Sequence, residues 1–141
     1  MSRVCIVVAG FYADLADELL RGAAKRLEDA GHEYDVVPVP GAFEIPAAIR
    51  IAMDSKRYEG YVALGCVIRG QTSHYDYVCT ESARGLNQLA IDHRAAIGYG
   101  IPTVENFEQA WERAAIDKGN KGAAAVEACL TITNLKIQMK P

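Results

Sequence analysis

The chain has 141 residues, the length of one domain, and its composition of 50% hydrophobic and 23% charged residues is that of a globular protein. A formal net charge of −3, without a basic stripe interleaved with aromatic residues, argues against a nucleic-acid or membrane surface. No apolar run approaches membrane-spanning length. We therefore expect one soluble domain over residues 1–141, with no nucleic-acid or membrane partner.

The N-terminus and the cysteines favour a cytoplasmic protein. Met1, Ser2 and Arg3 lead directly into an apolar stretch, without the longer apolar region and cleavage site of a signal peptide. The cysteines form no Cys-x-x-Cys pair and have no histidine nearby at metal-ligand spacing, so we interpret them as reduced packing residues and expect no metal site. They are Cys5, Cys66, Cys79 and Cys129.

The periodicity of apolar residues predicts four strands, each followed by one or more helices. The predicted strands are Val4–Ala9, Tyr34–Val39, Tyr61–Ile68 and Ala95–Ile101. The predicted helices cover Leu15–Leu27 up to a stop at Gly31, then Ile45–Ser55, His74–His93, Phe107–Ile116 and Lys121–Lys140. Four β–α units imply an α/β fold with a four-stranded parallel sheet flanked by helices, which binds ligands at the carboxyl ends of its strands.

The predicted helix at Ile45–Ser55 is unusually apolar, because Arg50 is the only charge among its first nine residues. One interpretation is deep burial within the domain, and the other is an interface between subunits. We favour the interface, since a small domain has few places that surround a helix completely.

Polar and aromatic residues follow the first two strands. Phe11 and Tyr12 come after the first strand, where Phe11 could stack on a planar ligand, although large aromatics are most often core residues. Glu44 lies in the turn between Pro40 and Pro46, where its carboxylate either favours the helix dipole or accepts ligand hydroxyls.

The segment after the third strand combines several signals for an anion site. Ser73 followed by Asp76 matches a capping box and predicts a helix N-terminus, whose free N–H groups favour a phosphate. Arg69, Gln71 and Thr72 add donors there.

His74, in the first turn of that helix, is a candidate general base, because the helix dipole disfavours the imidazolium; a structural histidine is the alternative. Arg113 and Lys121 could reach an anion from the C-terminal helices or could simply be solvated. A dinucleotide fingerprint, a Walker loop and a nucleophile elbow are all absent from the sequence, which disfavours nucleotide enzymes and serine hydrolases.

Four motifs, in this order and spacing, resemble the lumazine synthase family over nearly the whole chain. They are PGAFEIP at 40–46, GCVIRGQTSHYDYV at 65–78, TVENFEQA at 103–110 and GNKG at 119–122. The resemblance implies a flavodoxin-like three-layer sandwich and the condensation of 5-amino-6-(D-ribitylamino)uracil with 3,4-dihydroxy-2-butanone 4-phosphate, with loss of phosphate and water. It implies no metal and no organic cofactor.

The resemblance also assigns roles to residues. Phe11 should stack on the pyrimidine, Ala42, Phe43 and Glu44 should hold the ribityl chain, and Cys66, Val67 and Ile68 should present backbone groups to the ring. Gln71 and Thr72 match the phosphate turn, Arg113 and Lys121 match basic residues near the phosphate, and His74 matches the proton-transfer residue. Tyr99 stands where an aromatic, frequently Phe, covers the ligand.

By resemblance the chain forms a homo-oligomer, a homopentamer, with active sites between subunits, and the motifs leave open whether pentamers remain free or form a larger shell. Two rivals remain beside the enzyme. A binding module of the flavodoxin or response-regulator kind is disfavoured, because no acidic pair or Ser/Thr-rich loop follows the first strand. A riboflavin-binding or shell-forming paralogue with little activity is not excluded by the motifs.

Overall fold

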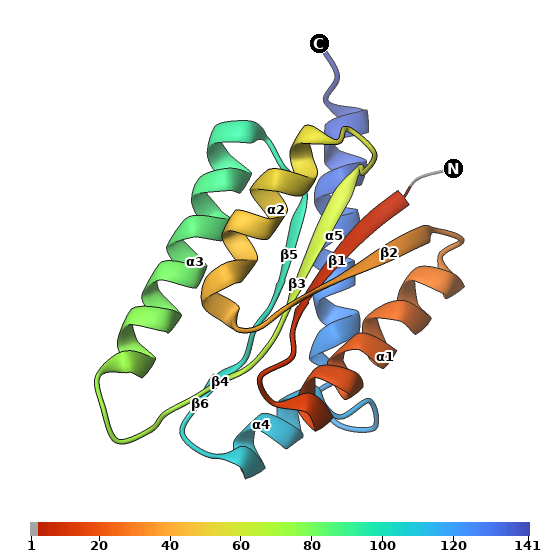
Figure 1. The fold of residues 1–141 in the computed structure, drawn as a ribbon. Helices are drawn as coiled ribbons and strands as arrows, with labels where there is room; N and C mark the ends of the chain where they lie inside the picture. Colours follow the sequence, from red (N-terminus) through yellow and green to blue (C-terminus); the bar gives the residue numbers. More distant parts are fainter. Residues whose placement is uncertain (1–2) are drawn as a thin grey trace.

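The chain folds into an open sheet of four parallel strands with helices on both faces, as predicted (Figure 1). The computed structural model describes residues 3–141, so the start at Met1 and Ser2 considered above lies outside the described residues. The strand order is β2-β1-β3-β5, and each neighbouring pair is parallel. This is the flavodoxin-like three-layer arrangement expected from the sequence.

The main sheet consists of β1 (Arg3–Ala9), β2 (Glu33–Val39), β3 (Gly60–Leu64) and β5 (Ile97–Gly100). The helices are α1 (Ala13–Asp29), α2 (Ile45–Asp54), α3 (His74–His93), α4 (Phe107–Ala114) and α5 (Lys121–Gln138). A 3-10 helix, η1 (Ala42–Glu44), precedes α2, and a separate small sheet pairs β4 (Val67–Ile68) with β6 (Thr103–Val104).

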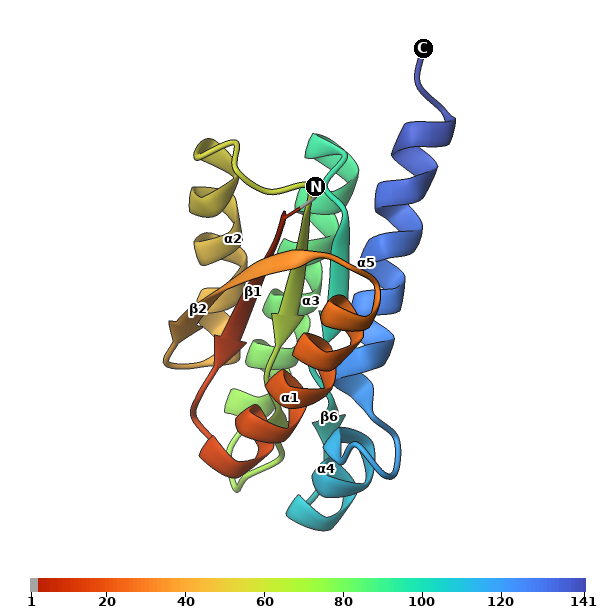
Figure 2. The ribbon, with the colours of Figure 1, turned by 90° about the vertical axis from the view of Figure 1, so that its right-hand side faces the viewer.

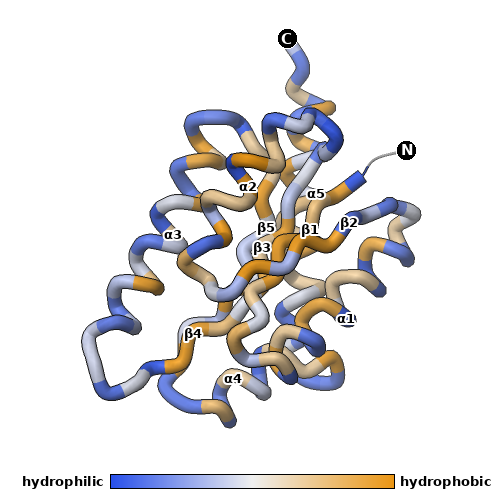
Figure 3. Tube along the Cα trace, in the orientation of Figure 1, coloured by the Kyte–Doolittle hydropathy of each residue, from blue (hydrophilic) through white to orange (hydrophobic). Residues whose placement is uncertain are grey.

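Alternation along β1 divides the core into two halves. Even-numbered residues from Val4 to Val8 pack with α1 and α5, and odd-numbered residues from Cys5 to Ala9 pack with α2 and α3. Figure 2 shows the two helix pairs on opposite sides of the sheet. In Figure 3 the central strands are mostly orange and the helices alternate between orange and blue, as expected for strands buried on both faces and helices buried on one.

The predicted third strand, Tyr61–Ile68, is wrong in one respect, because the structure divides it. β3 ends at Leu64, and after Gly65 and Cys66 the chain resumes as β4, which pairs only with β6. The interruption matches Pro102 in the neighbouring segment, which has no N–H to donate to the ladder. Its carbonyl accepts the N–H of Val67 at 2.9 Å, where the small sheet begins.

The predicted helices are confirmed, with shifts of their ends. α1 stops at Asp29, and Gly31 follows with a φ of +81°, the left-handed conformation that favours glycine after a helix. α4 ends at Ala114 rather than Ile116, because Ala115 is already extended. α5 ends at Gln138, before Lys140.

The helix α2 is not enclosed by its own domain. Ile45 and Ile49 are fully buried against the sheet, whereas Ile51 is 71% exposed on the outer face of the helix. The deep-burial interpretation of this helix is therefore wrong, and the interface interpretation stays a prediction.

Candidate active site

A cavity of about 520 Å³ opens beside the carboxyl ends of β1 and β3. Three segments line it: the turn after β1, the turn at η1, and the stretch from the end of β3 through β4 to the start of α3. The predicted site residues that it brings together are Phe11, Ala42, Phe43, Glu44, Cys66, Val67, Ile68, Thr72 and His74. The position of this cavity thus supports the expectation that the site lies at the carboxyl ends of the strands.

The turn after β1 contributes an exposed aromatic face. The Phe11 side chain is 76% exposed, and its ring meets that of half-buried Tyr12 edge to face, with centroids 4.9 Å apart. Tyr12 packs against the core, and its carbonyl accepts the N–H of Ala16 at 2.9 Å, which fixes the start of α1. The exposed face of the Phe11 ring is therefore available for stacking with a planar ligand, and Tyr12 supports the ring from the side of the core.

The turn at η1 is closed by its own carboxylate. Glu44 Oε1 accepts the backbone N–H of Gly41 at 3.0 Å, while Ala42 is buried and Phe43 is 54% exposed at the cavity. Among the described residues, no other hydrogen bond or ion pair engages the Glu44 side chain. Its second oxygen is thus available to a ligand, so the carboxylate can stabilise the turn and still accept a ligand hydroxyl.

β4 presents an edge of backbone groups. The N–H groups of Val67 and Arg69 donate to the β6 side, to Pro102 and Val104, both at 2.9 Å. Alternate residues of a strand direct their N–H groups to opposite edges, so the N–H of Ile68 faces the edge of β4 that has no partner strand. Such a group suits a polar ring atom of a ligand.

Cys66 lines the same cavity with its thiol. Burial, with a smaller effect of the nearby Cys79, raises the pKa of the Cys66 thiol from 9.0 to about 11. At neutral pH the thiol stays protonated, so it lines the cavity as a packing group rather than as a nucleophile.

The start of α3 differs from the sequence prediction in its capping. Ser73 is the N-cap residue, as expected, but its side chain makes no capping hydrogen bond, so the predicted capping box is wrong. Instead Thr72 Oγ1 accepts the N–H of His74 at 3.3 Å, because the backbone of Ser73 is helical rather than extended. His74 is the first residue of α3 and is exposed at the cavity.

The Arg69 guanidinium is paired with two carboxylates. Its Nε lies 3.0 and 3.2 Å from the two carboxylate oxygens of Glu105, and its guanidinium is 3.6 Å from Asp76. The sequence offered no signal for the first pair, because Glu105 is 36 residues away.

Four predicted residues do not line the cavity within one chain. Gln71 is exposed between two lining residues, and Tyr99 lines a different hollow of about 480 Å³ between β5 and α3. Arg113 lies on α4, where its guanidinium donates to the carbonyl of Gln109 at 3.0 Å, and Lys121 begins α5. A single subunit therefore supplies only part of the predicted set.

The cavity also includes residues to which the sequence prediction gave no role. Tyr12 and Tyr75 are the aromatic ones, and both stand in runs with predicted site residues, Phe11-Tyr12 and His74-Tyr75. Burial raises the pKa of the Tyr75 hydroxyl, so it stays protonated near neutral pH. The remaining lining residues are Gly41, Gly70 and Val78.

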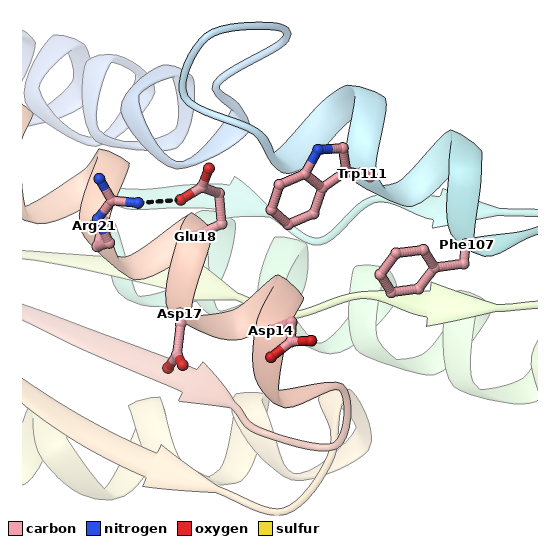
Figure 4. Close-up of a pocket in the computed structure, with 6 residues that line it drawn as sticks. All are labelled: Asp14, Asp17, Glu18, Arg21, Phe107 and Trp111. Atoms are coloured by element: carbon pink, nitrogen blue, oxygen red, sulfur yellow. Dashed lines mark hydrogen bonds and ion pairs between the residues drawn. The ribbon is translucent and has the colours of Figure 1, made fainter.

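A third hollow, of about 470 Å³ between α1 and α4, is lined mainly by acidic and aromatic side chains (Figure 4). Asp14, Asp17 and Glu18 face it with a single cation, Arg21, which is paired to Glu18 at 2.5 Å. The stacked rings of Phe107 and Trp111 form its other side. An excess of carboxylates repels an anionic substrate, so this hollow is a poor phosphate site.

No group of three or more His, Cys, Asp or Glu side chains in residues 3–141 is arranged to hold a metal ion. None of the described helices has the length and apolar character needed to span a bilayer.

Comparison with known proteins gives one consistent answer. The sequence profile of the family described as 6,7-dimethyl-8-ribityllumazine synthase matches residues 1–136. The 6,7-dimethyl-8-ribityllumazine synthase of Afipia carboxidovorans is 53% identical over 140 residues, covering 96% of this chain and 86% of the relative. That of Zymomonas mobilis is 51% identical over 136 residues, covering 96% and 97%. The chain therefore belongs to the 6,7-dimethyl-8-ribityllumazine synthase family.

Proposed function

We propose that the chain condenses 5-amino-6-(D-ribitylamino)uracil with 3,4-dihydroxy-2-butanone 4-phosphate to form 6,7-dimethyl-8-ribityllumazine, a step of riboflavin biosynthesis. Family membership over nearly the whole chain supports this reaction. The observation that carries the assignment is the cavity, which gathers an exposed aromatic ring, a carboxylate and a histidine beside a helix N-terminus. No observation favours a paralogue without activity.

In this proposal the pyrimidine lies on Phe11, and backbone groups of the stretch from Cys66 to Ile68 bind its polar edge. The free N–H of Ile68 on the unpaired edge of β4 supports the second contact. The ribityl chain lies along η1, where the unused oxygen of Glu44 accepts its hydroxyls.

The phosphate of the second substrate is proposed to bind at the start of α3, at Gln71 and Thr72. The positive dipole end of a twenty-residue helix supports this position. Arg113 and Lys121, which do not line the cavity of their own chain, would complete the phosphate site from a neighbouring subunit, with Tyr99 covering the ligand.

The reaction needs positioning and proton transfers, and its atoms balance without a cofactor. The 5-amino group attacks the ketone and water leaves to give an imine; loss of a proton and of phosphate follows. This elimination leaves an enol, which tautomerises to a new methyl ketone. The ribitylamino nitrogen then closes the second ring on that carbonyl, and a second water leaves. His74, exposed at the cavity, is proposed to move protons in these steps.

We propose a homopentamer with sites shared between subunits, since Tyr99, Arg113 and Lys121 lie outside the cavity of their own chain. The exposed Ile51 on α2 supports an interface there, since an isolated subunit would leave this side chain in water. A cytoplasmic location is proposed too, supported by four free cysteines.

Incubating the purified oligomer with both substrates and following the lumazine by absorbance and mass tests the reaction. Phosphate should be released in equal amount. Riboflavin binding without lumazine formation would contradict the proposal and favour the binding paralogue.

A further inference from the structure

Arg69 joins two loops that lie far apart in the sequence. It follows β4, and its side chain forms hydrogen bonds with both carboxylate oxygens of Glu105, which follows β6. The same guanidinium lies 3.6 Å from the carboxylate of Asp76 in the first turn of α3 and 4.2 Å from the ring centre of Tyr75. One side chain thus connects β6 with the start of α3.

The Glu105 end of this connection is held in place. The backbone N–H of Glu105 donates to the side chain of Gln109 on α4 at 2.8 Å, and Gln109 in turn donates its backbone N–H to the cap residue Asn106 at 2.9 Å. Arg69 itself donates its backbone N–H to Val104. The bridge therefore starts from an anchored carboxylate.

The segment on the other side of Arg69 carries much of the cavity and has few contacts of its own. Gly70, Thr72, His74 and Tyr75 all line the cavity. Within the described residues, the hydrogen bonds inside this turn are those from His74 to Thr72 and from the Asp76 N–H to the Ser73 carbonyl. Its position depends on what holds its two ends.

Direct binding of phosphate by Arg69 is the competing interpretation. Two carboxylates already lie within 3.6 Å of its guanidinium, so its positive charge is largely offset for a third anion. The Nε–H of Arg69 is shared between the two oxygens of Glu105, and the guanidinium lies against the ring of Tyr75. These contacts favour a supporting role.

We infer that Arg69 is a positioning residue: by bridging Glu105 to the first turn of α3, it holds residues 70–75 in the conformation that receives the phosphate substrate. The inference rests on the proposed function, because it assigns the butanone phosphate to this turn. The pyrimidine contacts proposed at Phe11 and at the backbone of residues 66–68 lie outside residues 70–75.

Whether Glu105→Gln raises or lowers the KM for the butanone phosphate separates positioning by Arg69 from direct phosphate binding by Arg69. Arg69→Gln and Glu105→Gln should each raise the KM for the butanone phosphate by about tenfold and leave the KM for the pyrimidine within about twofold. The double variant should resemble either single variant, because both break the same bridge. If Arg69 bound phosphate directly, Glu105→Gln would free its charge and lower the KM for the butanone phosphate, which would overturn the inference.

A matched control removes an ordinary long-range ion pair. Glu127→Gln breaks the pair with Arg26 between α5 and α1, 101 residues apart, and should leave both KM values unchanged. A fall in thermal midpoint in the Arg69 and Glu105 variants with both KM values unchanged would show a merely structural bridge and reject the inference.

Binding of inorganic phosphate to the assembled protein, measured by calorimetry, gives a readout independent of turnover. Binding that is weakened in both variants but not in the control supports positioning. If the wild type makes no lumazine but phosphate binding is still weakened in Arg69→Gln and Glu105→Gln and not in Glu127→Gln, the proposed reaction is refuted and the role of Arg69 stands. If phosphate binding is not weakened in the two variants, the role of Arg69 is refuted.

Discussion

The rings of Phe11 and Tyr12 stand nearly perpendicular, with their planes at 88° and their centroids 4.9 Å apart. The edge-to-face contact supports Phe11 from the side of the protein, while Tyr12 packs against the core. Phe11 nevertheless leaves 76% of its surface exposed, at the mouth of the cavity. An aromatic ring in this position is oriented before a ligand arrives.

Phe11→Ala should therefore weaken the pyrimidine more than the butanone phosphate. Stacking acts on the planar substrate and is worth about 0.5–1.5 kcal/mol beyond area burial, so the KM for the pyrimidine should rise about three- to tenfold. Steady-state kinetics with each substrate varied in turn measure both values. Phe107→Ala, which removes another exposed phenylalanine, is the matched control. If Phe11→Ala raised the KM values for the two substrates equally, the stacking role would be contradicted.

His74→Ala should lower kcat by about 10²–10⁴-fold, because general acid–base catalysis by a positioned side chain contributes this much. Pyrimidine binding, measured by calorimetry without the second substrate, should change little. His93→Ala at the far end of α3 is a control, since His93 is also exposed but does not line the cavity. Undiminished turnover at saturation would exclude His74 from the mechanism.

Local sequence patterns predicted the elements, because buried strands and one-sided helices have characteristic periods. The division between β3 and β4 was not predictable in this way. It depends on Pro102, which belongs to the neighbouring segment and becomes relevant only once the strands are paired. β6 has two residues and η1 has three, too few to show a period.

The candidate site could be predicted as far as its residues are contiguous in the sequence. Phe11, Glu44 and His74 each stand next to a strand end or helix start, and the fold brings those ends together. The bridge from Arg69 to Glu105 could not be predicted, because it joins side chains 36 residues apart. The residues expected from a neighbour lie outside the cavity of their own chain, and their assignment to the site rests on the family resemblance rather than on a local pattern.

Gly122→Ala should destabilise the subunit. A Cβ at this position would lie 2.1 Å from the carbonyl oxygen of Leu19 and 3.0 Å from the backbone N of Ala23, so α1 and α5 would have to separate. Overpacking of this kind costs about 1–3 kcal/mol or more. Denaturant unfolding at one fixed protomer concentration measures the loss. Gly10→Ala, whose Cβ would have no neighbour within 4 Å, should unfold like the wild type; equal losses in both would contradict the packing argument.

The protein should lose stability in alkali through its buried thiols. Burial raises the pKa of Cys129 from 9.0 to about 11, so the folded state keeps a proton that the unfolded state releases above pH 9. The stabilisation is complete below about pH 9 and is lost as the pH rises to about 11, by up to about 2.7 kcal/mol for this thiol.

Comparing unfolding between pH 8 and 11 in the wild type and in Cys129→Ser isolates this contribution. Serine does not titrate, and its hydroxyl can replace the weak contact of the Cys129 thiol with the Ala96 carbonyl at 3.6 Å. The variant should lose less stability over this range. Parallel losses would show that Cys129 takes no part in the alkaline transition.

The final prediction concerns the division of the site between chains. His74 lines the cavity, whereas Arg113 lies on α4, outside it, and donates to Gln109 of its own helix. If Arg113 serves a neighbour, then His74→Ala and Arg113→Ala proteins, each nearly inactive alone, should regain activity when they are unfolded together and refolded. Random mixing in equal amounts makes roughly a quarter of the shared sites intact at both positions. If both residues served one site from the same chain, every site would keep one defect, and mixing would restore nothing. Mass spectrometry of the intact oligomers would confirm subunit exchange, so that mixed oligomers no more active than their parents would reject the shared site.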